Sequence, residues 1–207
     1  MDFLKVYSRL DPSIPLICVC GNHDVGNRPT KETIASYRSS FGDDYFSFWH
    51  GGVHFLVLNS QFYEDASLVP DLARAHDLWL DEQLAESKRL GATHLVLFHH
   101  IPWFLKDADE EKCYFNVEPE LRKRMLDKFL AAGVKKVFTG HYHRNAGGWY
   151  KDALEVVVTT AVGCQIGPDT HGMRVVKVAK DGITHEFVPL QEFPTQVKLE
   201  KQEEKQK

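Results

Sequence analysis

The chain has 207 residues, of which 43% are hydrophobic and 26% charged, which suffices for one globular domain with a substantial core. Its formal net charge of −4 argues against a broad basic surface for nucleic acid. The sequence has no signal-peptide pattern and no apolar run long enough to cross a bilayer, so we expect a soluble, cytoplasmic protein. The four cysteines form no CxxC pair and do not suggest a disulfide framework.

The sequence of the first third of the chain predicts two helices, a buried strand and a hairpin. Residues 2–10 have the apolar spacing of an amphipathic helix, and the apolar run 14–20 is typical of a strand buried on both faces. Thr30 is suited to cap a helix that extends to Phe41. The predicted hairpin has strands at residues 45–49 and 53–59.

The rest of the chain alternates between helical and strand patterns, which favours a layered α/β architecture. We expect residues 61–70 to form an irregular surface loop. Two helices are predicted at 71–90 and 118–132, and five strands are predicted at 93–98, 134–139, 154–160, 173–178 and 183–188. We assign residues 1–195 to one α/β domain and residues 196–207, which are rich in Lys, Glu and Gln, to a disordered tail.

Asparagine and histidine side chains follow three of the apolar runs. The segments are Gly21-Asn22-His23-Asp24, His99-His100-Ile101-Pro102 and Gly140-His141-Tyr142-His143. Open α/β sheets place their sites at the carboxyl ends of their strands, so we expect the three segments to form one polar site. Nitrogen and oxygen ligands of this kind suit Mn, Fe or Zn, and a carboxylate such as Asp24 can fix the tautomer of a histidine.

These three motifs, in this order, resemble the second half of the calcineurin-like metallophosphoesterase signature. Segments 42–49, 58–63 and 140–148 bring the resemblance closer to family members classed as serine/threonine protein phosphatases. The resemblance covers nearly the whole chain except the charged tail. It implies a β-sandwich flanked by helices, here lacking the first strands, with two divalent metal ions at one end of the sheets.

The resemblance also implies a role for each residue of the motifs. Asn22, His100 and His141 would bind one metal ion, and His143 would bind the other. The His-x-Pro register selects His100 rather than His99, because neighbouring side chains of a strand point to opposite faces.

The catalytic roles fall on the first motif. His23 would contact the phosphoryl group or protonate the leaving oxygen, and Asp24 would orient His23. Tyr142, Arg144 and Asn145 follow the last metal motif and are candidates for substrate binding, with simple loop packing as the alternative.

Two family motifs are missing from the sequence. An Asp-x-His and a Gly-Asp-x-x-Asp should precede Gly21, and the second of these supplies the carboxylate that bridges the two metals. Gly42-Asp43 has Phe46 where an Asp is required, and Asp169-Thr170-His171 comes after the other motifs in a loop. Neutral ligands alone leave the repulsion between two divalent cations uncompensated. We therefore expect this chain to be a fragment, a truncated isoform or an incomplete gene model of a longer active protein.

The leading hypothesis is a metal-dependent phosphatase that hydrolyses phosphoserine and phosphothreonine in proteins by direct attack of a metal-bound hydroxide, impaired in this chain. A phosphoprotein would be its partner, with no role for nucleic acid or membrane. One alternative is a phosphodiesterase or nucleotide hydrolase of the same fold. The other is a non-catalytic binding module that lost its N-terminal metal ligands.

Overall fold

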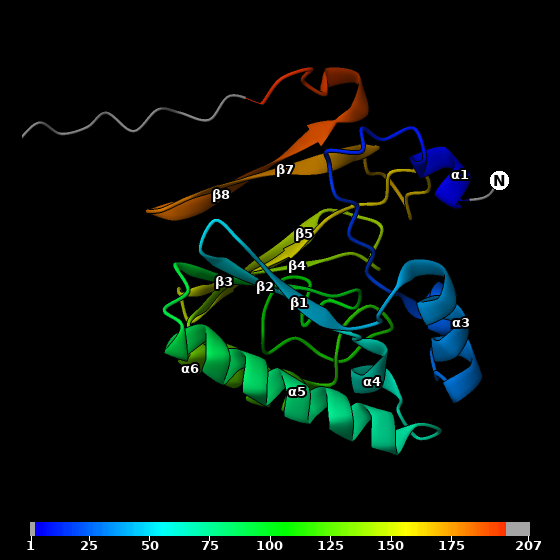
Figure 1. Cartoon of the computed structure of the whole chain (residues 1–207), viewed down its shortest axis with the longest axis vertical. Coiled ribbons are helices and arrows are strands. Elements are labelled where there is room, and N and C mark those ends of the chain that lie inside the picture. The colour runs from blue at the N-terminus through cyan, green and yellow to red at the C-terminus, as the bar shows by residue number, and fades with distance from the viewer. Residues whose placement is uncertain (1–2, 198–207) are drawn as a thin grey trace, which may run out of the picture.

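The computed structural model describes residues 3–197, which form a layered α/β arrangement (Figure 1). The main sheet has six strands in the order β1-β2-β3-β4-β6-β5. Their bounds are β1 Phe46–His50, β2 Val53–Val57, β3 His94–Phe98, β4 Val134–Thr139, β5 Ala146–Tyr150 and β6 Leu154–Val158. Strands β2, β3, β4 and β6 are parallel, whereas β1 and β5 are antiparallel edge strands. The carboxyl ends of the four parallel strands therefore lie along one edge of the sheet.

Helices α5 and α6 cover one face of this sheet (Figure 1). The helices are α1 Phe3–Tyr7, α2 Asn22–Val25, α3 Lys31–Phe41, α4 Gln61–Glu64, α5 Pro70–Arg89 and α6 Pro119–Ala132, followed by the 3-10 turn Leu190–Glu192. Leu80 of α5 and Phe129 of α6 pack against Leu95 and Leu97 of β3 in the largest core cluster. Within residues 3–197, no helix combines the length and hydropathy that crossing a bilayer requires.

A two-stranded antiparallel sheet covers the other face. It consists of β7 Gly172–Ala179 and β8 Gly182–Pro189. Val178 and Ile183 from this hairpin pack against Val96 and Phe138 of the main sheet. Because side chains alternate along a strand, β3 contributes Leu95 and Leu97 to the helical layer and Val96 to the hairpin layer. A central sheet flanked by helices confirms the predicted α/β class.

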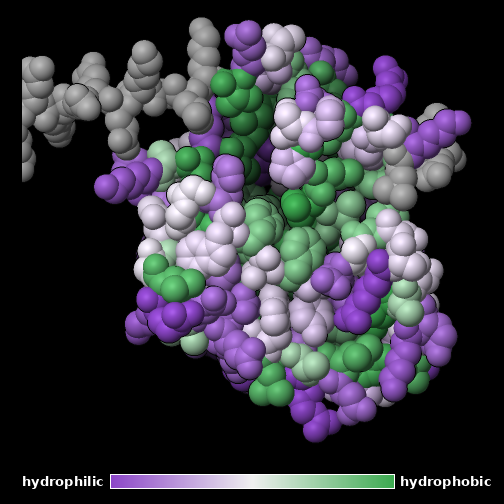
Figure 2. Space-filling model, in the orientation of Figure 1, coloured by the Kyte–Doolittle hydropathy of each residue, from purple (hydrophilic) through white to green (hydrophobic). Residues whose placement is uncertain are grey.

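The apolar run 14–20 is not a strand, which corrects the sequence prediction. It pairs with no strand of either sheet, and Ile14 is 54% exposed. Only its last residue, Cys20, is fully buried, in a small cluster with Val25 and Ile34. Figure 2 shows apolar residues gathered in the upper middle of the face where this segment runs in Figure 1. An apolar run becomes a strand only beside a neighbour that accepts its backbone hydrogen bonds, and Pro15 offers no donor of its own.

Three further element predictions are corrected. The first helix is shorter than 2–10, because its end is closed by a bond from the Leu10 amide to the Tyr7 carbonyl. The segment 61–70 contains α4, whose aromatic residues are buried near His76, so it is not a surface loop. Strand β5 was not predicted, because glycines disfavour strands. Here glycine is required, because a side chain at Gly147 would collide with the Val156 carbonyl of β6. Residues 198–207 of the predicted tail 196–207 lie outside the described residues, as does residue 2, at which the first helix was expected to begin.

Candidate functional site

Asn22, His100 and His141 meet at the carboxyl edge of the main sheet. Asn22 is the first residue of α2, and the two histidines follow β3 and β4. Nε2 of His100 lies 2.9 Å from Oδ1 of Asn22 and 3.1 Å from Nδ1 of His141. Two ligands held at right angles by one ion, with bonds of about 2.1 Å, lie about 3.0 Å apart. The two spacings measured from Nε2 of His100 are therefore short enough for ligands of a single metal ion.

Hydrogen bonds on the far sides of these groups fix which atoms face the centre. Nε2 of His141 donates to the main-chain carbonyl of Tyr114 over 3.1 Å, which leaves Nδ1 unprotonated. Nδ2 of Asn22 donates to the hydroxyl of Tyr114 over 3.2 Å, which turns Oδ1 toward His100. A single N–H at Nε2 of His100 then has to donate to two acceptors, Oδ1 of Asn22 and Nδ1 of His141. A cation between the three atoms would satisfy all of them at once, so the residues fit a metal ion.

The electrostatic surroundings keep the two histidines neutral. Burial, followed by repulsion from a protonated His141, lowers the pKa of His100 to about 3. Smaller repulsive contributions to this lowered pKa come from His99, His143 and His23. Burial also lowers the pKa of His141. Metal ligation requires neutral imidazole, so both groups are in the binding state at neutral pH.

Gly21 and Ser60 support His100, a role that the motifs did not predict for either residue. A Cβ atom added at Gly21 would lie 2.8 Å from Nδ1 of His100, so only glycine allows the backbone to pass this close. The buried hydroxyl of Ser60 accepts hydrogen bonds from the amides of His100 and Ile101, over 3.2 and 2.9 Å. The position of Ser60, just beyond the strand next to β3, is the sequence signal that would have identified it.

His143 lies in the same turn but is not bonded to the three donors. Its φ of 55° and the φ of 65° at His141 are both left-handed, which costs about 1–3 kcal/mol per residue and is typical of functional turns. The hydroxyl of Thr160 donates to the His143 carbonyl over 3.0 Å. Nδ1 of His143 is buried and has no partner among the described residues. A buried nitrogen without a partner also fits a metal ligand.

Asp24 is bonded to the turn that carries Asn22. His23 and Asp24 are both exposed on α2. Oδ2 of Asp24 accepts a 2.8 Å hydrogen bond from the amide of Gly21, and no hydrogen bond joins it to His23 in the described chain. Asp24 thus closes the first turn of α2, and the catalytic roles of His23 and Asp24 stay predictions.

The three substrate-binding candidates differ in their surroundings. The guanidinium of Arg144 lies 5.2 Å above the ring of Tyr142 and bonds its hydroxyl over 3.4 Å. Asn145 is tied to the neighbouring loop, because its amide donates to Asp169 over 2.5 Å and its side-chain oxygen accepts from Arg174 over 2.9 Å. Contact of Tyr142, Arg144 and Asn145 with substrate stays a prediction for all three residues. The Asp169 carboxylate is bonded to Asn145 and so holds this loop, whereas an Asp-x-His motif suggests a metal-binding role.

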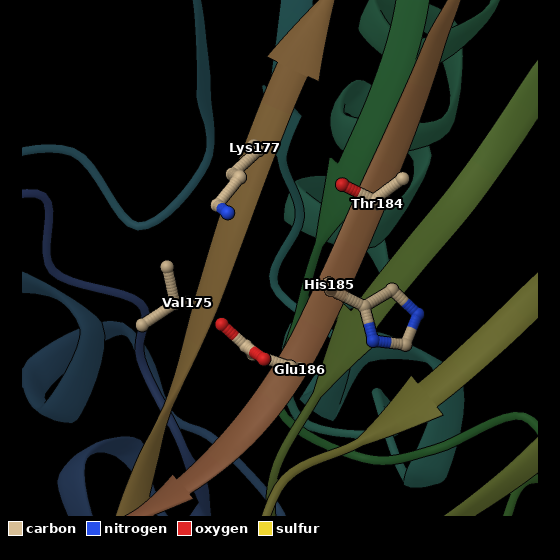
Figure 3. Close-up of a pocket in the computed structure, with 5 residues that line it drawn as sticks. All are labelled: Val175, Lys177, Thr184, His185 and Glu186. Carbon is tan, nitrogen blue, oxygen red and sulfur yellow. The ribbon is translucent and has the colours of Figure 1, made fainter. Parts of the chain in front are cut away.

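The three donors include no carboxylate. Within residues 3–197, no group of three His, Cys, Asp or Glu side chains is placed to hold a metal ion. A separate hollow of about 120 Å³ lies on the β7–β8 hairpin (Figure 3). Its imidazole, His185, is directed away from Glu186 and is bonded to Arg174 and Glu155. That hollow is not part of the candidate site.

Comparisons with known proteins agree with this geometry. The family model described as Calcineurin-like phosphoesterase matches residues 1–145. The bovine serine/threonine-protein phosphatase CPPED1 is 56% identical over 192 residues, covering 93% of this chain and 61% of that protein. The human CPPED1 is 53% identical over 193 residues, with the same two coverages. This chain thus spans about three fifths of the length of these curated relatives.

A solved structure supports the fold independently. The protein described as "GAP50 the anchor in the inner membrane complex of Plasmodium" has a TM-score of 0.54 at 14% identity, covering 70% of this chain and 49% of that one. At this identity the likeness concerns the fold alone. The family match extends over the motifs that supply Asn22, His100 and His141, which are the residues that converge in the structure. The chain belongs to the calcineurin-like phosphoesterase family.

Proposed function

We propose that this chain carries the metal-binding part of a phosphatase that hydrolyses phosphoserine and phosphothreonine in proteins. The observation that carries the proposal is the approach of Asn22 and His141 to Nε2 of His100, over 2.9 and 3.1 Å, with the Nδ1 atom of His141 unprotonated and suited to a cation. The relatives in cattle and human are named serine/threonine-protein phosphatases, which supports the substrate class.

The site residues divide into metal ligands and groups for the phosphate. Asn22, His100 and His141 would hold one divalent ion, with Mn, Fe or Zn suited to such ligands, and His143 would hold a second. Bound ions would neutralise phosphoryl charge and lower the pKa of water. His23, exposed next to Asn22, would donate a proton to the leaving oxygen.

Tyr142 and Arg144 lie beside the histidine turn. Arg144 carries a fixed positive charge and a planar fork of donors, which suits phosphate or an acidic side chain next to it in a protein substrate. The Nε atom of Arg144 donates to the Ile166 carbonyl, and its guanidinium lies over the ring of Tyr142.

A second candidate function is a non-catalytic module that binds one ion. The observation in its favour is the neutral ligand set, since no carboxylate joins Asn22 and the histidines among the described residues. Two divalent ions close together repel each other strongly unless an anionic ligand lies between them. A single ion in a half-site has no such requirement.

Metal content and turnover, measured on one sample, test the proposal. The purified chain is loaded with Mn²⁺, and its metal stoichiometry is compared with hydrolysis of p-nitrophenyl phosphate and a phosphoserine peptide. We expect metal retention and turnover in wild type, both lost in His141→Ala and both kept in His50→Ala, whose imidazole is exposed at the end of β1.

The bovine relative serves as the positive control for turnover. One bound ion without turnover would favour the non-catalytic module. A chain that retains no metal would refute the proposal.

A further inference from the structure

We propose that Tyr114 is a positioning residue of this site, which orients Asn22 through its hydroxyl and His141 through its main-chain carbonyl. The inference rests on the proposed metal-binding function and names the element that regulates ligand geometry. Tyr114 lies on the long connection between β3 and α6, far in sequence from both partners.

Tyr114 contacts two of the three donors at once. Its hydroxyl accepts from Nδ2 of Asn22 over 3.2 Å, and its carbonyl accepts from Nε2 of His141 over 3.1 Å. Its ring also lies 5.1 Å from the imidazole of His141, centroid to centroid. Tyr114 is 55% exposed, whereas Asn22 is only 7% exposed, so the tyrosine covers the buried amide from the solvent side.

The connection that carries Tyr114 is held in one conformation. Arg122 of α6 is fully buried and donates to the carbonyls of Ala108, Glu110 and Val117 over 2.9, 2.6 and 2.8 Å. A buried guanidinium with these carbonyl partners is costly to leave unsatisfied, so it resists movement of the loop. Arg122 therefore supplies hydrogen-bond donors to carbonyls of this loop, which has no helix or strand to supply them.

Side chains within the loop complete this framework next to Tyr114. The amide of Cys113 donates to Oδ1 of Asn116 over 2.8 Å, and Nδ2 of Asn116 donates to Glu110 over 2.7 Å. Lys112 bonds both the Asn116 carbonyl and Glu64 of α4, over 2.6 and 2.7 Å. Both residues before Tyr114 are thus anchored, which fixes the direction of its carbonyl and its ring.

The chemical consequence concerns the two faces of the Asn22 amide. One face is an oxygen that binds a cation, and the other is an NH₂ group that repels one. Because the hydroxyl of Tyr114 accepts from Nδ2, the oxygen is the face turned toward His100. Without that hydroxyl the amide is free to rotate, and part of the population presents NH₂ to the ion. Groups that orient metal ligands in this way commonly contribute 10- to 100-fold to affinity.

A double-mutant cycle tests the inference. Co²⁺ affinity is measured by competition with a chromophoric chelator for wild type, Tyr114→Phe, Asn22→Ala and the double variant. We expect Tyr114→Phe to bind Co²⁺ about 10-fold more weakly and to change the visible absorption bands of bound Co²⁺. In the Asn22→Ala background the same substitution should have no further effect, because the group through which it acts is gone.

The matched control is Tyr150→Phe. Tyr150 lies on β5, away from the site, and its hydroxyl is bonded to Asp127 of α6 over 2.7 Å. We expect this substitution to leave Co²⁺ affinity unchanged. The Asn22 side-chain amide resonance of the metal-free protein should shift in Tyr114→Phe and not in Tyr150→Phe, which reports the contact itself.

The outcomes separate this inference from the proposed function. Wild-type affinity in Tyr114→Phe, or equal losses in both backgrounds, would overturn the positioning role while leaving metal binding intact. A wild-type chain that binds no Co²⁺ would overturn the metal site and the positioning role together.

Discussion

Gly21→Ala is the substitution whose effect on the site follows most directly from the coordinates. The added Cβ would lie 2.8–2.9 Å from three atoms of the His100 ring. Carbon makes ordinary contacts at about 3.5 Å, so the overlap is about 0.7 Å. Gly21 is part of the backbone turn before α2, so the imidazole is the group that moves.

The displacement removes the spacing on which metal binding depends. A shift of about 0.7 Å in the ring would lengthen the 2.9 Å contact between Nε2 of His100 and Oδ1 of Asn22 to about 3.6 Å, which is no longer a hydrogen bond. Misplacing a functional group by about 1 Å lowers activity about 100-fold. Overpacking of this kind destabilises a fold by about 1–3 kcal/mol.

The assay is Co²⁺ affinity by chelator competition, with urea unfolding on the same variant. We expect Gly21→Ala to bind Co²⁺ at least 10-fold more weakly while remaining folded at 25 °C. Gly182→Ala is the matched control, because a Cβ at that position meets nothing within 4 Å. Unchanged affinity in Gly21→Ala would refute the claim that His100 must approach the turn so closely.

Three other substitutions test the support of the site and the stability of the fold. Ser60→Ala leaves two buried amides without their acceptor, so we expect a loss of about 1–3 kcal/mol in unfolding free energy and weaker Co²⁺ binding. Thr30→Ala removes the cap that accepts from the Thr33 amide at the start of α3, and should lower the unfolding free energy by about 1 kcal/mol with no change in Co²⁺ affinity. Burial lowers the pKa of His99 to about 3, so the unfolded chain binds more protons below pH 6.5 and stability falls on acidification. Between pH 7 and pH 5 the unfolding free energy of the metal-free chain, measured with urea, should fall by about 2 kcal/mol. His99→Phe should reduce this dependence of stability on pH. An unchanged dependence would show that other groups cause it.

The sequence predicted the parts of the fold that depend on local patterns. The hairpin around Gly51-Gly52, the helices that became α3, α5 and α6, and the strands β3 and β4 all formed near the expected bounds. Their signals are caps, glycine stops and apolar periodicity, all of which act within a few residues. The second and third candidate metal motifs fell at strand ends for the same reason, because β3 and β4 are buried runs that stop where the polar residues begin.

The errors occurred where distant residues decide the local structure. The run 14–20 has the composition of a strand, but no described strand pairs with it. Strand β5 has two glycines that weaken its pattern, and its place is set by β6. The resemblance implies that Asp24 orients His23, and the fold also brings the Asp24 carboxylate to the Gly21 amide, a contact that the motif does not indicate. Tyr114 and Ser60 carry no motif, since their importance comes only from which donors the fold brings beside them.

The burial that stabilises the unprotonated histidines also determines how the site responds to acid. An imidazole with an ordinary pKa binds protons near pH 6.5, so protons compete with the metal there. His100, whose pKa burial lowers to about 3, meets that competition only in strong acid. The unfolded chain, however, takes up protons at its histidines well above that pH. Loss of metal on mild acidification should therefore follow unfolding of the chain rather than titration of His100 in the folded site, and the two processes should share one midpoint.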